Sequence, residues 1–254
     1  MALPTTKTKP KTDFLTARVA IIGPPKIGKS TFASQLGDGV IFAATESGLD
    51  YLEVFQTKID KYEDFANMVT ELTTTKHQFK TVVIDTIDKL IEKAENLICQ
   101  RNKVPFIKDM PYGAGYTATK RMIIADLDKL TAAGLGYSLI GHCKEKEFMT
   151  ESIKYTAMAT SLGKSYEESV LGQVDFIFYC YSDSSKQRKI LTKPTKYVQC
   201  AGDRSTKLPE KMDMNAQLVI DILKGEIKVE HTQNTLTVTQ IKAPSVQADK
   251  GKLQ

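Results

Sequence analysis

The segment that most constrains the fold is "GPPKIGKS" at residues 23–30, which directly follows the apolar run "RVAII". It matches the pattern G-x-x-x-x-G-K-[ST], in which a glycine-rich loop joins a strand to a helix and surrounds phosphate oxygens with backbone N–H groups. With average residue usage, a chance match in a chain of 254 residues occurs on the order of one per cent of the time. The segment therefore predicts a strand, a phosphate-binding loop and a helix at "STFASQL".

The fixed positions of this loop each have a chemical role. The lysine at position 29 reaches the β and γ phosphates of a nucleotide, and the hydroxyl of Ser30 binds Mg²⁺. We therefore expect ATP and Mg²⁺ as ligands. The residues expected to bind the nucleotide are Gly23, Pro24, Pro25, Lys26, Ile27, Gly28, Lys29, Ser30 and Thr31.

Short apolar runs alternate with helical patterns through the first part of the chain. Strands are expected at "RVAIIG", "GVIFAA", "KTVVID" and "YSLIGH", and helices at "KYEDFANMVTELTTT", at "TIDKLIEKAENLICQ" and around an apolar stripe that ends near Gly134. Continuous apolar strands between helices are typical of a parallel sheet covered on both faces. Residues 148–159 and 174–200 are strand-rich. We therefore predict an α/β fold with a mainly parallel central sheet and antiparallel strands toward the C-terminal side.

The chain is expected to form one globular domain, because 254 residues with 41% apolar composition can bury one sizeable core. We expect a flexible basic arm at 1–17, a core at 18–225 and a mobile tail at 226–254, which contains a short strand at most. The last core helix is "MNAQLVIDILKG", with Gly225 as its C-cap.

No apolar run approaches the roughly 18 residues needed to cross a bilayer, and the amino terminus lacks the pattern of a signal peptide. We therefore expect a cytoplasmic protein without a membrane partner. The four cysteines form no C-x-x-C pair, which favours reduced thiols over a zinc site.

A phosphate loop works with a carboxylate that helps to hold Mg²⁺. The segment "KTVVIDTIDKL" places Asp85 at the carboxyl end of a buried strand, where α/β sheets bind their ligands. We therefore expect Ser30 and Asp85 to be the metal-binding residues. Asp88 is the rival carboxylate, but it begins the next helix, where we expect it to act as a cap.

A second carboxylate, Glu46, lies where the strand "GVIFAA" ends. If this strand is the neighbour of the strand that carries the phosphate loop, Glu46 could polarise a water molecule for attack on the γ phosphate. The alternative is a solvated turn residue before Ser47 and Gly48. Spacing alone leaves both interpretations open.

The order of these motifs resembles that of the RecA-core ATPases, and more closely that of phage-encoded RecA-like nucleotide-binding proteins that include single-strand annealing recombinases. The resemblance covers roughly residues 18–225 and rests on "ATESGLD", "DMPYGAGY", "LIGHCKEKE" and "GDRSTKLPE". It implies a RecA-like P-loop NTPase core that hydrolyses ATP and acts on single-stranded DNA in phage recombination or annealing, in the host cytoplasm.

The resemblance also implies roles for individual residues. Glu46 matches the catalytic glutamate that activates water and works with Lys29. His142, at the end of "YSLIGH", falls where RecA-like proteins commonly have a polar sensor of the γ phosphate. A histidine that only completes a strand end is the alternative at this position.

RecA-like ATPases complete their site with a cation from a neighbouring subunit. Arg204 in "GDRSTKLPE" resembles this residue, with Lys193 and Lys196 as rivals, and this implies a homo-oligomer. An ion pair between Asp203 and Arg204 on the surface accounts for the same sequence at least as well.

Two segments resemble DNA-binding loops, residues 102–116 and 144–165. They combine lysines with aromatic residues, which suits base stacking and phosphate neutralisation, although the aromatic rings could also pack on the core. The residues expected to contact single-stranded DNA are Lys103, Phe106, Lys108, Tyr112, Lys154 and Lys164. A host or phage single-strand-binding protein is a further partner in this interpretation.

Two other functions stay open at this point. One is an ATP-gated DNA-binding or annealing module with little turnover. The other is a nucleotide-kinase-like phosphotransferase, which needs several arginines around two adjacent nucleotides, whereas the five arginines here are scattered along the chain. The net charge of +5 permits nucleic-acid binding but does not require it.

Overall fold

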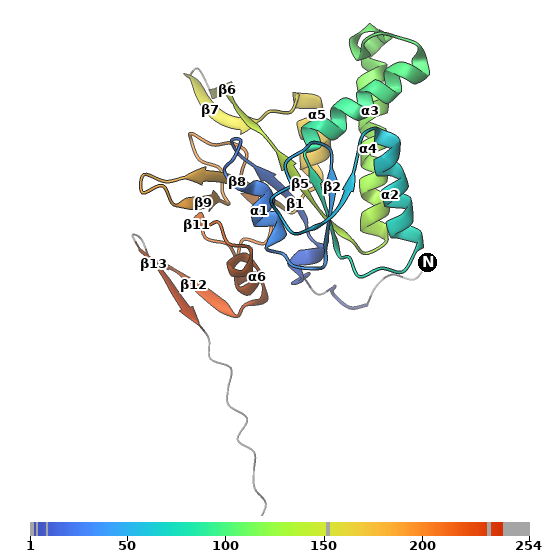
Figure 1. Ribbon diagram of the computed structural model, residues 1–254. Coiled ribbons are helices and arrows are strands. Elements are labelled where there is room, and N and C mark those ends of the chain that lie inside the picture. The colour runs from blue at the N-terminus through green and yellow to red at the C-terminus, as the bar shows by residue number, and fades with distance from the viewer. Residues whose placement is uncertain (1–2, 4, 9, 151–152, 233–234, 241–254) are drawn as a thin grey trace, which may run out of the picture.

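A twisted sheet forms the centre of the molecule in the computed structural model, which describes residues 3, 5–8, 10–150, 153–232 and 235–240 (Figure 1). The sheet has nine strands in the order β11-β9-β8-β1-β5-β4-β2-β3, with β10 paired to β8. The strands are β1 (Arg18–Ile22), β2 (Val40–Ala44), β3 (Phe55–Lys58), β4 (Thr81–Asp85), β5 (Gly136–Gly141), β8 (Phe176–Ser182), β9 (Arg188–Leu191), β10 (Gly202–Asp203) and β11 (Lys211–Asp213).

The strands from β8 to β3 all run parallel, whereas β9, β10 and β11 are antiparallel to their neighbours. This confirms the predicted α/β class with a mainly parallel sheet and antiparallel strands on the C-terminal side. Parallel strands place their carboxyl ends at one edge of the sheet, and this edge is where ligands bind in open α/β folds.

Helices cover both faces of the sheet. The short helix α1 (Lys29–Ser34) and α6 (Ala216–Lys224) pack on one face, and α2 (Tyr62–Thr74), α3 (Ile87–Asn102), α4 (Ala114–Ala132) and α5 (Lys164–Val170) pack on the other. Neighbouring strand residues therefore enter different cores, as Ile21 and Ile22 do. This arrangement explains why the parallel strands are apolar at consecutive positions. None of the helices among the described residues is both long and apolar enough to cross a bilayer.

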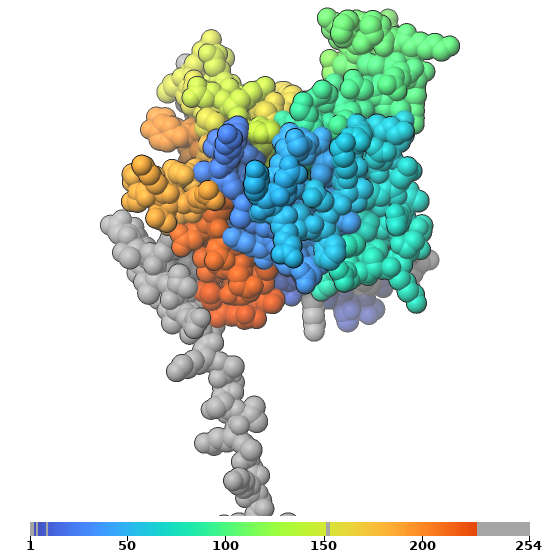
Figure 2. Space-filling view, viewed as in Figure 1, coloured from blue at the N-terminus to red at the C-terminus, as the bar shows by residue number. Residues whose placement is uncertain are grey.

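Two elements project beyond the carboxyl edge of the sheet. The first is the tip between α3 and α4, with the 3₁₀ turns η2 (Ile107–Asp109) and η3 (Pro111–Gly113). The second is the antiparallel hairpin of β6 (Cys143–Thr150) and β7 (Ile153–Thr160). Figure 2 shows them as two separate projections on the same side of the molecule.

Ordered structure extends beyond residues 18–225 at both ends of the predicted core. Phe14 lies in a 3₁₀ turn, η1 (Phe14–Thr16), and is only 4% exposed because its ring packs on Phe176, so the core begins before Arg18. After Gly225, the backbone forms the antiparallel pair β12 (Ile227–Thr232) and β13 (Thr235–Gln240), where we expected a tail with one short strand at most. Residues 241–254 of that tail lie outside the described residues.

Candidate nucleotide-binding site

The phosphate loop leaves β1 at the carboxyl edge and enters α1, as the sequence predicts. Gly23 has no room for a side chain, because a Cβ atom there would lie 2.7 Å from the carbonyl oxygen of Cys180 on β8. Gly28 has a φ of 101°, in the left-handed region that favours glycine. Packing against β8 and the sharp turn into α1 thus account for both glycines of the motif.

The side chain of Lys29 is buried inside the loop. Its Nζ donates hydrogen bonds of 2.9 Å to the carbonyl oxygens of Gly23 and Pro24. Burial lowers the pKa of this ammonium group, partly offset by nearby groups that include Asp85. The loop therefore already holds the cation that a phosphate group would need.

Ser30 and Asp85 meet at the end of β4. The Ser30 hydroxyl donates a hydrogen bond of 2.6 Å to Oδ2 of Asp85, and Asp85 is only 6% exposed. Burial raises the pKa of Asp85 above its usual range, while the hydrogen bond from Ser30 and the charge of Lys29 oppose this shift. A hydroxyl and a carboxylate oxygen are ligands that Mg²⁺ prefers. The hydroxyl of Thr86 is buried beside them and has no hydrogen-bond partner in the part of the chain that the structure describes. This donor set fits Mg²⁺.

The ends of β2 and β4 are joined by a buried threonine. The backbone N–H of Thr86 donates to Oγ1 of Thr45 at 2.6 Å, and this hydroxyl donates to the carbonyl oxygen of Thr86 at 3.0 Å. The N–H of Thr45 donates to the carbonyl oxygen of Asp85 at 2.9 Å. These bonds fix the backbone that carries Asp85 relative to the backbone that leads into Glu46.

Glu46 follows β2 at the carboxyl edge, but one premise of its predicted role is wrong. Strands β5 and β4 lie between β1 and β2, so the strand of Glu46 is not the neighbour of the strand with the phosphate loop. Glu46 is exposed and lines a cavity of about 580 Å³ together with Lys58 and Asp60. Glu46 comes two residues after Ala44, which pairs with Asp85, so its backbone is still close to the predicted metal site.

His142 links β5 to the projecting hairpin. Its backbone N–H donates to Oδ2 of Asp88 at 3.2 Å, and its ring Nδ1 lies 3.6 Å from the same oxygen. The other carboxylate oxygen of Asp88 accepts a hydrogen bond from the hydroxyl of Ser161. Asp88 is therefore not the helix cap that we predicted. It holds both ends of the β6–β7 hairpin, since Ser161 follows β7 directly.

Arg204 lies near the amino ends of the parallel strands, whereas the phosphate loop of its own chain lies at their carboxyl ends. Its guanidinium group is 3.2 Å from Asp175, which also binds Arg18 at 2.6 Å, so its partner is Asp175 and not Asp203. Asp203 instead accepts hydrogen bonds from Ser205 and Leu208. A role of Arg204 in the site of a neighbouring subunit stays a prediction.

Five of the six residues predicted to bind DNA lie on the two projections, and the sixth, Lys164, lies outside them. Lys103, Phe106, Lys108 and Tyr112 lie on the exposed tip between α3 and α4, where Nζ of Lys108 is 5.3 Å from the ring centre of Phe106. Lys154 lies on β7, and Lys164 begins α5, where its Nζ is 3.9 Å from Glu168. All six are exposed.

Some residues of the same segments have structural roles instead. Tyr116 packs edge to face on Tyr166, and Lys146 binds Glu167 at 2.7 Å, which ties the hairpin to α5.

Sequence reasoning missed one residue at the site. Arg188, the first residue of β9, places Nη1 of its guanidinium group 2.8 Å from the position that a Cβ atom of Gly28 would take. The sequence offers no local signal for this contact, because it depends on β8 lying next to β1.

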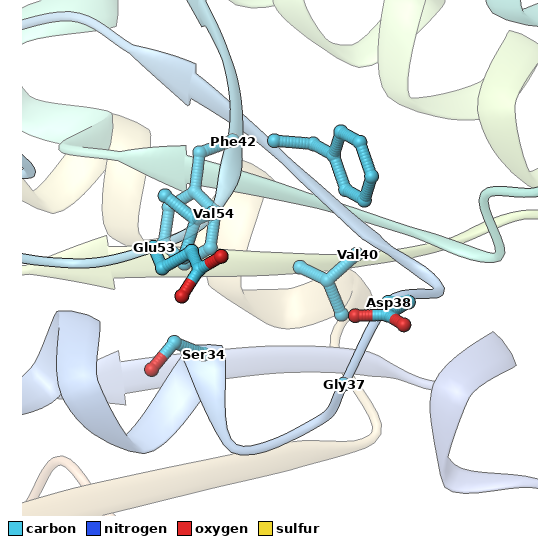
Figure 3. Close-up of a pocket in the computed structure, with 8 residues that line it drawn as sticks. Ser34, Gly37, Asp38, Val40, Phe42, Glu53 and Val54 are labelled. Carbon is cyan, nitrogen blue, oxygen red and sulfur yellow. The ribbon is translucent and has the colours of Figure 1, made fainter.

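A separate cavity of about 460 Å³ lies beside the carboxyl end of α1 (Figure 3). It is lined by the end of α1, the turn at Gly37 and Asp38, and the first residues of β2 and β3, with the carboxylates of Asp38 and Glu53 among its labelled side chains. It lies toward the amino ends of the strands, away from the edge that carries Asp85.

Comparison with known proteins agrees with this geometry. A family model described as an AAA domain matches residues 15–205, well over half of the chain. A search of curated proteins finds no match. The matched range contains the phosphate loop, Asp85 and the six parallel strands. The chain therefore belongs to this family of AAA domains and has the fold of a P-loop nucleotide-binding protein.

Proposed function

We propose that this protein is an ATP-binding, Mg²⁺-dependent ATPase of RecA type that acts on single-stranded DNA in recombination or strand annealing. The observation that carries the proposal is that one edge of the sheet holds the phosphate loop with Lys29, Ser30 and Asp85 and also the bases of both projections. Membership of the AAA-domain family supports nucleotide binding. The DNA-directed part rests on the residues of the projections.

The residues at this edge suit hydrolysis of a phosphoanhydride. In the proposed reaction, Glu46 accepts a proton from a water molecule that attacks the γ phosphorus, and the β–γ bridging oxygen leaves with ADP. Lys29 offsets negative charge on the phosphates. When bound, Mg²⁺ supplies further positive charge to the phosphate oxygens, and Ser30 and Asp85 are the residues that would hold it.

Single-stranded DNA is the partner that the projections suit best. Phe106 is 60% exposed and Tyr112 is fully exposed, although large aromatic side chains normally bury most of their surface. Exposed rings beside lysines can stack on unpaired bases while the lysines neutralise the backbone. His142 and Asp88 join the base of the hairpin to the nucleotide edge, which supports coupling between DNA and nucleotide.

A homo-oligomer is part of the proposal, because a neighbouring copy could present Arg204 to the phosphates. The Arg204 side chain is 58% exposed despite its ion pair with Asp175, so it can reach another molecule.

The rate of ATP hydrolysis with and without single-stranded DNA tests the function. We expect DNA to raise the rate, Lys29→Ala to abolish ATP binding, and Glu46→Gln to bind ATP but turn over about 10² to 10⁴ times more slowly. Asp50→Asn is the matched control, since Asp50 is an exposed carboxylate that lines the same cavity as Glu46.

The same assay separates the alternatives. ATP-dependent DNA binding with no turnover in any condition would identify a nucleotide-gated binding module. Phosphate transfer to a nucleoside monophosphate would identify a kinase.

A further inference from the structure

Arg188 is the arginine that lies against the phosphate loop. Three atoms of its side chain lie close to the position that a Cβ atom of Gly28 would take. The distances from this position are 2.8 Å to Nη1, 3.4 Å to Cζ and 3.8 Å to Cδ. The guanidinium group therefore lies directly over the last glycine of the loop. Gly28 is also the residue whose backbone turns into α1, next to Lys29.

The backbone of Arg188 is held in this place from both sides. On one side it pairs with Ser182 of β8, and on the other its carbonyl oxygen accepts a hydrogen bond of 3.1 Å from the N–H of Met214. The turn before it is closed by Asp183, whose Oδ1 accepts hydrogen bonds from the N–H groups of Ser185 and Gln187 at 2.9 and 2.8 Å. Because β8 pairs with β1, this hairpin keeps Arg188 beside the loop.

The side chain of Arg188 makes no hydrogen bond or ion pair with any residue that the structure describes. Its neighbour Lys189 differs, because Nζ of Lys189 lies 2.5 Å from Asp213. Lys29, the buried lysine of the loop, has only carbonyl oxygens as hydrogen-bond partners among the described residues. No carboxylate among the described residues is bound to Arg188 or to Lys29, and two such cations close together favour the binding of an anion.

We propose that Arg188 binds phosphoryl oxygens of the nucleotide held by the phosphate loop of its own chain. A planar guanidinium group can donate two parallel hydrogen bonds to a phosphate group, and a lysine ammonium cannot reproduce this geometry. Arg188 then contributes to nucleotide affinity in cis, in contrast to Arg204, whose proposed role needs a neighbouring subunit. This inference rests on the nucleotide-binding function proposed above.

Equilibrium titration with fluorescent ATP and Mg²⁺ tests the proposal on the full chain. We expect Arg188→Ala to weaken binding by about tenfold to a hundredfold, which is the usual effect of losing a hydrogen bond to a charged group. Arg188→Lys should recover only part of this loss. Lys189→Ala is the matched control, because it removes the adjacent cation on the same strand, and it should bind as the wild type does. Circular dichroism checks that each variant is folded.

The outcomes separate this inference from the proposed function. If the wild type binds no nucleotide, the proposed function fails. If the wild type binds and Arg188→Ala binds equally well, the function stands and the role of Arg188 is wrong.

A mixing experiment tests the cis assignment. An excess of Lys29→Ala protein, which keeps Arg188 but lacks its own binding site, is added to Arg188→Ala protein. We expect no change in affinity, and recovery of tight binding would show that Arg188 acts on a neighbouring subunit instead.

Discussion

Ser30 and Asp85 are 55 residues apart in the chain, and a hydrogen bond of 2.6 Å joins their side chains at the carboxyl edge of the sheet. The bond links the phosphate loop, which follows β1, with β4, although β5 lies between these two strands. It therefore crosses the end of β5, next to the point where His142 begins the connection to the hairpin. The predicted metal ligands and the predicted sensor are neighbours for this reason.

Relative to the wild type, the nucleotide-free Asp85→Asn variant should become the more stable protein as the pH rises. Burial raises the folded-state pKa of Asp85, so the folded chain binds a proton more tightly than the unfolded chain does. The resulting stabilisation is complete below about pH 4, the ordinary value for aspartate, and is lost as the pH rises through the folded value. Asparagine is neutral throughout and can still accept the hydrogen bond from Ser30.

Urea denaturation between pH 4 and pH 8 checks this expectation. The variant and the wild type should have similar free energies of unfolding at the acid end, and the variant should be the more stable one near neutral pH. Asp50→Asn, at an exposed carboxylate, should show no such trend. A wild type that gains stability over Asp85→Asn with rising pH would contradict the prediction.

Asp85→Asn should also lower the affinity for nucleotide in the presence of Mg²⁺ by about tenfold to a hundredfold.

Asp88→Ala should loosen the base of the β6–β7 hairpin. It removes the acceptor for the N–H of His142 and for the hydroxyl of Ser161, at a cost of about 1 kcal/mol, because the Asp88 side chain is partly exposed. Hydrogen exchange should become faster at the hairpin, and stimulation of ATP hydrolysis by DNA should fall. Glu92→Ala, on the exposed face of the same helix, is the control. Unchanged exchange in the hairpin would show that Asp88 does not hold it.

Most of the fold could be predicted because its signals are local. The run "RVAII" before the phosphate loop and the apolar face of α3 each show their structure within a few residues. Strand β3 could not be found in this way, since it is a short edge strand with mainly exposed residues and no apolar run.

The site was harder to predict where it depends on strand order. The phosphate loop and Asp85 have local signals, in the glycine-lysine-serine pattern and in the strand before the aspartate. The separation of Glu46 from the loop, the contact of Arg188 with Gly28 and the bond of Asp88 to Ser161 all depend on which strands are neighbours. No spacing along the chain contains that information.

Tyr62→Phe should destabilise the protein without affecting the site. The hydroxyl of Tyr62 donates a hydrogen bond of 2.7 Å to Asp126, and both residues are buried between α2 and α4. Phenylalanine removes one of the two side-chain partners that the described residues give this carboxylate and leaves Lys129, at a cost of about 1–3 kcal/mol in the free energy of unfolding. Urea denaturation measures the change. Tyr51 is fully exposed, so the control variant Tyr51→Phe should leave the free energy of unfolding unchanged. Equal stability of the two variants would contradict a structural role for the pair.

Phe106→Ala and Tyr112→Ala should each weaken binding of single-stranded DNA by about 1–3 kcal/mol, the range for one base stacked on an aromatic side chain. Neither change should alter the free energy of unfolding by more than about 0.5 kcal/mol, because both side chains are largely exposed. Fluorescence anisotropy with a labelled oligonucleotide measures binding, and the control is Tyr51→Ala, at an exposed aromatic residue that belongs to neither projection.

Lysine variants on the same projections distinguish stacking from charge. Lys103→Ala and Lys154→Ala should lower the dependence of affinity on salt, by about 0.7 in the logarithmic slope for each lost phosphate contact, whereas Phe106→Ala should leave that slope unchanged. If the lysine variants lost affinity with an unchanged salt slope, these residues would not contact the DNA backbone. If Phe106→Ala bound DNA as tightly as Tyr51→Ala does, the tip between α3 and α4 would not be a stacking surface, and the proposed DNA contact would be confined to the β6–β7 hairpin.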